Sequence, residues 1–67
     1  MNTLDILIIE YLKKGYNQAE IAIKLQEQEI KPNSLSSVEK KLKTIREFYG
    51  AKTLFHLGYI IALEKEN

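Results

Sequence analysis

The chain has 67 residues, which suffice for one domain of three or four helices around a small core. It contains no cysteine, so disulfide bonds and thiolate zinc sites are excluded, and apolar packing or a partner must stabilise the fold. Ten basic and nine acidic residues give a formal net charge of +1, which argues against a strongly basic nucleic-acid tail but allows a local basic face.

The N-terminal segment, residues 4–12, is apolar but lacks the features of a signal peptide or a membrane span. Asp5 and Glu10 interrupt it, no basic region precedes it, and it is far too short to cross a bilayer. We therefore expect a cytoplasmic, soluble protein with no membrane partner.

The first predicted helix covers residues 3–14. Its apolar side chains recur at spacings of three and four residues and therefore share one face: Leu4, Leu7, Ile8, Tyr11 and Leu12. Gly15 follows directly and suits the left-handed conformation that ends a helix.

The second predicted helix covers residues 17–28. The Asn17 side chain can cap its free backbone amides, and Glu20 stands three residues later, where it can reach back as in a capping box. Ile21, Ala22 and Leu25 form the inward stripe.

The third predicted helix covers residues 34–49, and it has one apolar and one basic-polar face. Either Ser34 or Ser36 can cap it, because Ser36 has Glu39 at the capping-box spacing. The side expected to be buried consists of Leu35, Val38, Leu42, Ile45 and Tyr49. The opposite side consists of Ser36, Lys40, Lys43, Thr44 and Glu47, with Glu39, Lys41 and Arg46 on the flanks.

The fourth predicted helix covers residues 53–64, with Thr53 as its cap. Its core side consists of Leu54, Leu57, Ile60 and Ile61. The other side carries Phe55, Tyr59 and Ala62, and so large an apolar stripe indicates self-association, because a small monomer offers nothing to cover it. The alternative is that Phe55 and Tyr59 pack beneath the N-terminal helix.

The chain resembles the LuxR/GerE-type helix-turn-helix domain, the DNA-binding module at the C-terminus of NarL/FixJ-type response regulators. The strongest match is residues 15–25, GYNQAEIAIKL, where the family pattern has a glycine, an aromatic or similar residue, a capping residue, Glu-Ile-Ala and a closing leucine. Ser37 and Val38 resemble the Thr-Val at the start of the family's recognition helix. Further positions in register are Leu42, Ile45, Gly50 and Ala51.

The resemblance implies an all-α fold, a single four-helix domain over residues 1–67, in which the third helix enters the major groove of DNA and the fourth builds a dimer. The implied base-reading residues are Glu39, Lys40 and Lys43, and the implied contacts to the DNA backbone are Asn17, Gln18, Ser36, Ser37 and Arg46. The implied dimer interface is Phe55, Tyr59 and Ala62. The expected partners are double-stranded DNA, a second copy of the chain and, where the chain is the output part of a longer regulator, a receiver domain or other signalling partner.

Glu39 departs from the family pattern, which commonly has a lysine there. A carboxylate near DNA is repelled by phosphate unless it accepts a hydrogen bond from cytosine N4 or pairs with Lys43 or Arg46. If Glu39 instead caps the third helix together with Ser36, the repulsion between its carboxylate and the DNA phosphates costs little binding energy.

Residues 26–33 are a second departure, because they enlarge the compact turn of the family by about six residues. This insert either lengthens the second helix or forms a wing-like loop. Glu27 and Glu29 make contact between the insert and DNA unfavourable, apart from Lys31.

No pattern indicates an enzyme, a cofactor or a metal. The carboxylates are scattered, no glycine-rich phosphate loop occurs, and the serines have only His56 as a possible base. We expect His56 to be a surface or capping residue, because a metal site would need further ligands.

The predicted function is sequence-specific binding of double-stranded DNA by a transcriptional regulator. The rival interpretation is that the lysines of the third helix form an ordinary solvated face. The domain would then be a protein-interaction module that uses Phe55 and Tyr59 without binding DNA.

Overall fold

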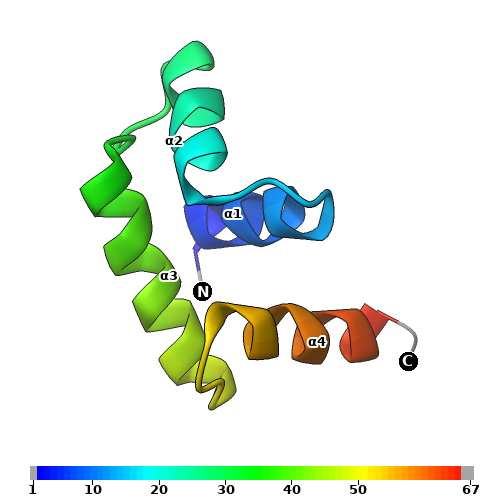
Figure 1. The fold of residues 1–67 in the computed structure, drawn as a ribbon. Coiled ribbons are helices and arrows are strands. Elements are labelled where there is room, and N and C mark those ends of the chain that lie inside the picture. Colours follow the sequence, from blue (N-terminus) through cyan, green and yellow to red (C-terminus); the bar gives the residue numbers. More distant parts are fainter. Residues whose placement is uncertain (1, 66–67) are drawn as a thin grey trace.

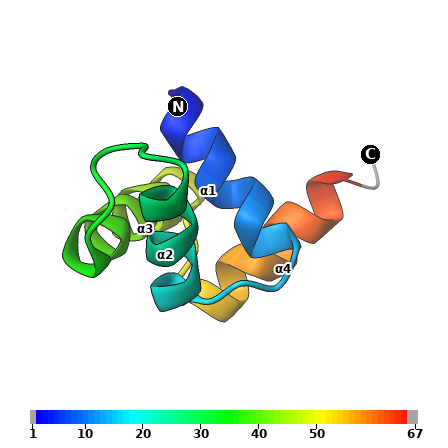
Figure 2. The same ribbon diagram turned by 90° about the horizontal axis from the view of Figure 1, so that it is seen from above.

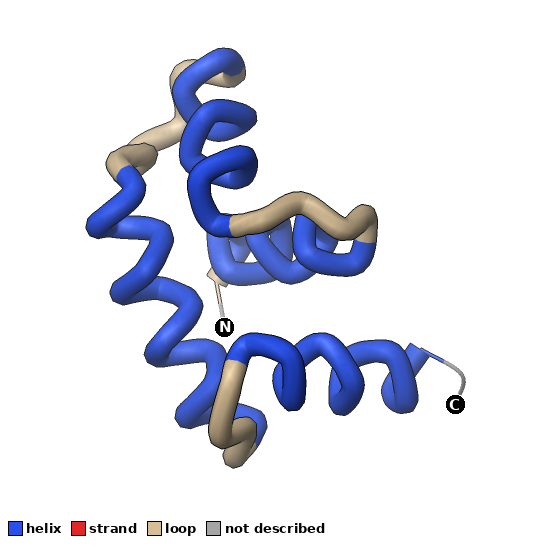
Figure 3. Tube along the Cα trace, viewed as in Figure 1, coloured by secondary structure: helices blue, strands red, loops and turns tan. Residues whose placement is uncertain are grey.

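The computed structural model describes residues 2–65, and within this range the chain forms four α-helices and no strand. They are α1 (Thr3–Lys13), α2 (Gln18–Glu27), α3 (Leu35–Tyr49) and α4 (Leu54–Lys65), shown in Figure 1. The all-α prediction is confirmed, and each predicted helix boundary lies within one residue of the observed one. Figure 3 shows the three connections, of which residues 28–34 form the longest.

Helices α1 and α3 each contact all three of the other helices. In Figure 1, α2 lies beside the N-terminal part of α3, and α4 lies at the C-terminal end of α3. Seen from above in Figure 2, α1, α2 and α4 all lie on one side of α3. One long side of α3 is therefore free of the other helices.

The hydrophobic core receives side chains from all four helices. It consists of Ile8, Ile9, Tyr11, Ile21, Ala22, Leu25, Val38, Leu42, Ile45, Leu57 and Ile61. The inward stripe predicted for α2 is confirmed completely. The side chains of Leu4, Leu7, Leu12, Tyr49 and Leu54 are partly buried against this cluster.

Leu35 is a correction to the predicted core, because its side chain is 46% exposed. It is the first residue of α3, and it lines an open groove beside the start of α2. The helical period gives its direction correctly, but at this end of α3 no neighbouring helix covers it. Asp5 and Ile9 are the converse case, since both are buried although the sequence pattern did not place them in the core.

The capping box predicted at Asn17 is confirmed. The Asn17 side chain accepts from the Glu20 N–H at 2.9 Å, and the Glu20 carboxylate accepts from the Asn17 N–H at 2.9 Å. The same reciprocal pair joins Asn2 and Asp5 at the start of α1, where the sequence analysis proposed no cap. Each box satisfies backbone amides that an isolated helix start leaves without a partner.

Ser34, and not Ser36, caps α3. The Ser34 hydroxyl oxygen accepts from the Ser37 N–H at 3.1 Å, and Ser34 has the extended backbone of a capping residue. The alternative capping box between Ser36 and Glu39 is therefore wrong, since Ser36 already lies inside the helix.

Helices α1, α2 and α3 end in the same way, with one residue in the left-handed conformation. These residues are Gly15, Glu29 and Gly50, with φ values of +90°, +57° and +69°. In each case the following residue donates its N–H to the carbonyl five residues earlier, which is the Schellman pattern. Glycine adopts this conformation without strain, whereas in Glu29 the Cβ atom comes close to the backbone carbonyl and makes the conformation unfavourable.

Most of the insert, residues 28–33, is a loop, whereas Gln26 and Glu27 are the last two residues of α2. Ile30 packs against the core, and the Gln26 side-chain amide donates to the Asn33 carbonyl at 3.0 Å across the base of the loop. The loop is thus anchored at both of its ends. In the described range, no helix is both long and apolar enough to cross a membrane.

Candidate nucleic-acid interface

The free side of α3 carries a polar face with two lysines and two glutamates. Its exposed side chains are Ser36, Glu39, Lys40, Lys43, Thr44 and Glu47. Helix α3 has 15 residues and is therefore about 22 Å long, and this face, from Ser36 to Glu47, covers about 17 Å of it. The predicted outward side of the helix is therefore confirmed as solvent-exposed.

Among the side chains of residues 2–64, Lys40 and Lys43 form no ion pair with a carboxylate. The lysines that do form ion pairs in this range are Lys13, Lys24 and Lys41. The charges of Lys40 and Lys43 are therefore available to a ligand that approaches the free side of α3.

One open groove, of about 340 Å³, borders this face on the side of α2. It is lined by Asn17, Gln18, Ala19, Leu35, Glu39 and Leu54. The starts of α2 and α3 meet here, and the first backbone amides of a helix carry partial positive charge. The groove thus combines amide donors with the exposed Glu39 carboxylate.

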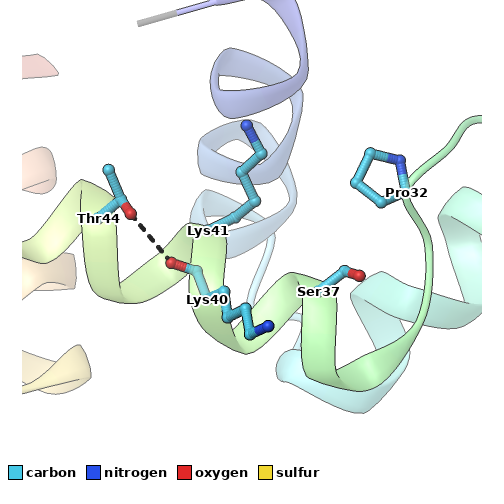
Figure 4. A pocket seen from close by; sticks show the side chains of 5 residues that line it. All are labelled: Pro32, Ser37, Lys40, Lys41 and Thr44. Atoms are coloured by element: carbon cyan, nitrogen blue, oxygen red, sulfur yellow. Dashed lines mark hydrogen bonds between the residues drawn. The ribbon is translucent and has the colours of Figure 1, made fainter.

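A second open groove, of about 280 Å³, borders the opposite flank of α3 (Figure 4). It is lined by Pro32, Ser37, Lys40, Lys41 and Thr44. In Figure 4 the Lys41 side chain extends towards α1, whereas the Lys40 side chain points the other way. Thr44 donates its hydroxyl to the Lys40 carbonyl at 3.1 Å and adds no charge.

Lys41, unlike Lys40, forms an ion pair within the domain. Its Nζ atom lies 3.4 Å from the Asp5 carboxylate of α1. Of the adjacent lysines in the groove, Lys40 is therefore the one available to a ligand.

The residues implied by the family resemblance fall into three places. Asn17, Gln18 and Glu39 share the first groove, Ser37 and Lys40 share the second, and Ser36 and Lys43 lie on the exposed face. Arg46 is half-buried and lines neither groove. Ser37 also belongs to the cap of α3, since its hydroxyl accepts from the Ser34 hydroxyl at 2.8 Å.

Leu35, Leu54 and Pro32 line the grooves although no sequence pattern predicts it. Helical periodicity assigns Leu35 and Leu54 to the core, and it says nothing about Pro32. The signal that could have identified Leu35 is its position directly after the Ser34 cap, where a helix often projects beyond its neighbours.

The exposed face of α4 carries the predicted apolar stripe. Phe55 is 88% exposed and Tyr59 is 60% exposed, so the alternative that they pack beneath α1 is wrong. Ala62 is exposed as well, and Leu63, which was not predicted there, is 47% exposed. The opposite side of α4 contributes Leu57 and Ile61 to the core.

His56 helps to cap α4, as expected. Its Nδ1 atom accepts from the Lys52 N–H at 3.1 Å, and its own N–H donates to the Thr53 hydroxyl at 3.0 Å. In α3, partial burial and secondarily the Glu64 carboxylate raise the pKa of the Tyr49 hydroxyl above its usual value.

Comparisons with other proteins add nothing to this geometry. Protein-family models, curated proteins and solved structures give no match to the chain. A functional assignment therefore depends on the residues of this chain and on their arrangement.

Proposed function

We propose that the protein is a cytoplasmic transcriptional regulator that binds double-stranded DNA sequence-specifically as a homodimer. In this proposal α3 lies in the major groove and the exposed face of α4 forms the dimer. The observation that carries it is the free side of α3, where Lys40 and Lys43 lack carboxylate partners in the described range and a groove borders each flank.

The dimensions of α3 suit the major groove. A helix with its side chains is about 10–12 Å wide, and the major groove of B-DNA is about 12 Å wide. When a helix lies in this groove, one DNA backbone runs along each of its flanks. Here one flank offers Asn17, Gln18 and the start of α2, and the other offers Ser37 and Lys40.

Each flank has donors that suit phosphate oxygens. Amide side chains and helix starts donate hydrogen bonds on one side, and a hydroxyl and an ammonium group donate on the other. Lys43 lies between the flanks, where it can donate to guanine N7 and O6. This division of contacts supports both positioning on the duplex and readout of bases.

A dimer follows from the small size of the module. A single domain of this size contacts few bases, and its affinity is limited accordingly. Pairing through Phe55 and Tyr59 would cover two exposed aromatic side chains, including the most exposed large apolar residue, Phe55, and present two copies of α3 to one duplex. The resemblance to LuxR/GerE domains supports the same arrangement.

Salt dependence tests the proposal. Fluorescence anisotropy of a labelled random-sequence duplex, titrated with the protein at about 50 and 200 mM salt, should show binding that weakens roughly tenfold or more at the higher concentration, because phosphate contacts release counterions. Binding that does not respond to salt would contradict phosphate contacts by α3.

A protein-interaction module is the second candidate, favoured by the 88% exposure of Phe55. This function would be supported if the folded protein bound no duplex at either salt concentration. An apolar interface would respond little to ionic strength, since it releases no counterions.

A further inference from the structure

We infer that Glu39 reads a cytosine in the major groove, and that Lys43 reads a guanine within about two base pairs of it. This rests on the proposed function and specifies the base pairs that α3 recognises. Glu39 is thereby a specificity-determining residue, and its negative charge is not merely tolerated beside DNA.

Glu39 neither caps α3 nor forms an ion pair with another described side chain. Ser34 caps α3 without it, because Ser36 already lies inside the helix. Among the side chains of residues 2–64, the Glu39 carboxylate has no hydrogen-bond partner and forms no ion pair with Lys43 or Arg46. Its side chain is exposed and lines the groove between α2 and α3.

Glu39 and Lys43 form no ion pair, although their spacing on the helix favours one. Glutamate four residues before lysine is the favoured spacing for an ion pair on a helix. Both side chains are exposed at that spacing, and each remains free to meet a base.

The chemistry of the base edges selects cytosine for Glu39. An ionised carboxylate only accepts hydrogen bonds, so it is repelled by the major-groove edge of guanine and by thymine O4. Adenine offers the N6 donor, but its N7 acceptor stands beside it. Cytosine presents the N4 donor and no acceptor of its own on this edge, and is therefore the best match.

The converse holds for Lys43, whose ammonium group only donates and therefore matches guanine N7 and O6. Four residues along a helix correspond to about 6 Å, and successive base pairs are about 3.4 Å apart. When α3 runs along the groove, the bases read by Glu39 and Lys43 are consequently about two base pairs apart.

Selection of binding sites from a randomised duplex library by the full chain tests the inference. The wild-type protein should select a cytosine and a guanine at this separation in each half-site, and replacing the cytosine by adenine should weaken binding about tenfold. The Glu39→Gln variant should select adenine at the cytosine position, because glutamine both accepts and donates.

Glu10→Gln is the matched control, since it removes the same charge from an exposed residue of α1, outside the proposed DNA-binding face. It should leave the selected sequence unchanged. If Glu39→Gln also selects the wild-type sequence, and both variants bind DNA more tightly to the same extent, Glu39 is not a base reader although DNA binding stands. If the wild-type protein, folded by circular dichroism, binds no duplex at about 50 mM salt, the proposed function itself fails.

Discussion

Asp5 and Lys41 form an ion pair between α1 and α3, with 3.4 Å between the carboxylate Oδ1 and the ammonium Nζ. Asp5 is only 9% exposed, and its carboxylate also accepts the Asn2 N–H. One side chain thus caps α1 and holds α3 against it. Among the adjacent lysines of α3, Lys41 has a structural role and Lys40 is left for a ligand.

Lys41→Met should lower the free energy of unfolding by about 1–2 kcal/mol, because it leaves a buried carboxylate without its cation while retaining the aliphatic stem. Urea unfolding measures this change. Lys40→Met is the control and should change stability by less than about 0.5 kcal/mol, since its side chain is exposed. If both variants lowered the free energy of unfolding equally, the ion pair between Asp5 and Lys41 would contribute nothing to stability.

Lys43→Ala should weaken binding to the selected DNA site by about 1–3 kcal/mol, because it removes a donor to a base edge. Fluorescence anisotropy at fixed salt measures the loss. Lys14→Ala removes the same charge from the C-terminal end of α1, which lies away from α3 (Figure 1), and should have a much smaller effect. Equal losses would show that Lys43 contributes only to the general charge.

Glu29→Gly should stabilise the domain by up to about 1 kcal/mol, because glycine adopts the left-handed conformation without a steric penalty. For a domain of this size, the midpoint of thermal unfolding should rise by about 4–8 °C per kcal/mol. Gly50→Ala makes the opposite change at the end of α3, where φ is +69°, and should lower the midpoint. A lower midpoint for Glu29→Gly would contradict the argument.

Phe55→Ser should abolish self-association without unfolding the domain, because this side chain is 88% exposed and contributes nothing to the core. Analytical ultracentrifugation over a range of concentrations should show a monomer. Ile23→Ser changes an exposed apolar residue of α2 instead and should associate like the wild type. If both variants associate normally, the dimer proposed through α4 is wrong.

Helix positions could be predicted well because the start and stop signals are local. Asn17 with Glu20 marks the start of α2, and Gly15 and Gly50 mark the ends of α1 and α3. Glu29 ends α2 in the same conformation but gives no such signal, since glutamate seldom adopts it. The exact end of α2 therefore required the structure.

Relations between helices could not be predicted from the sequence. Periodicity placed Lys41 on the flank of α3, but the facing carboxylate comes from α1, far away in the chain. Periodicity also assigned Leu35 to the core, because it shows on which side of α3 the residue lies but not whether another helix covers that position. The residues proposed to contact DNA remain predictions, although the structure places most of them in or between the grooves along α3.

The packing of α1 against α4 has a consequence for synthesis on the ribosome. Ile8 of α1 is fully buried, but the cluster around it also contains Leu57 and Ile61 of α4. Because α1 is synthesised before α4, its apolar face is completely covered only after α4 has followed. Domains generally fold as units, and this one should acquire stable structure only after α4 has emerged.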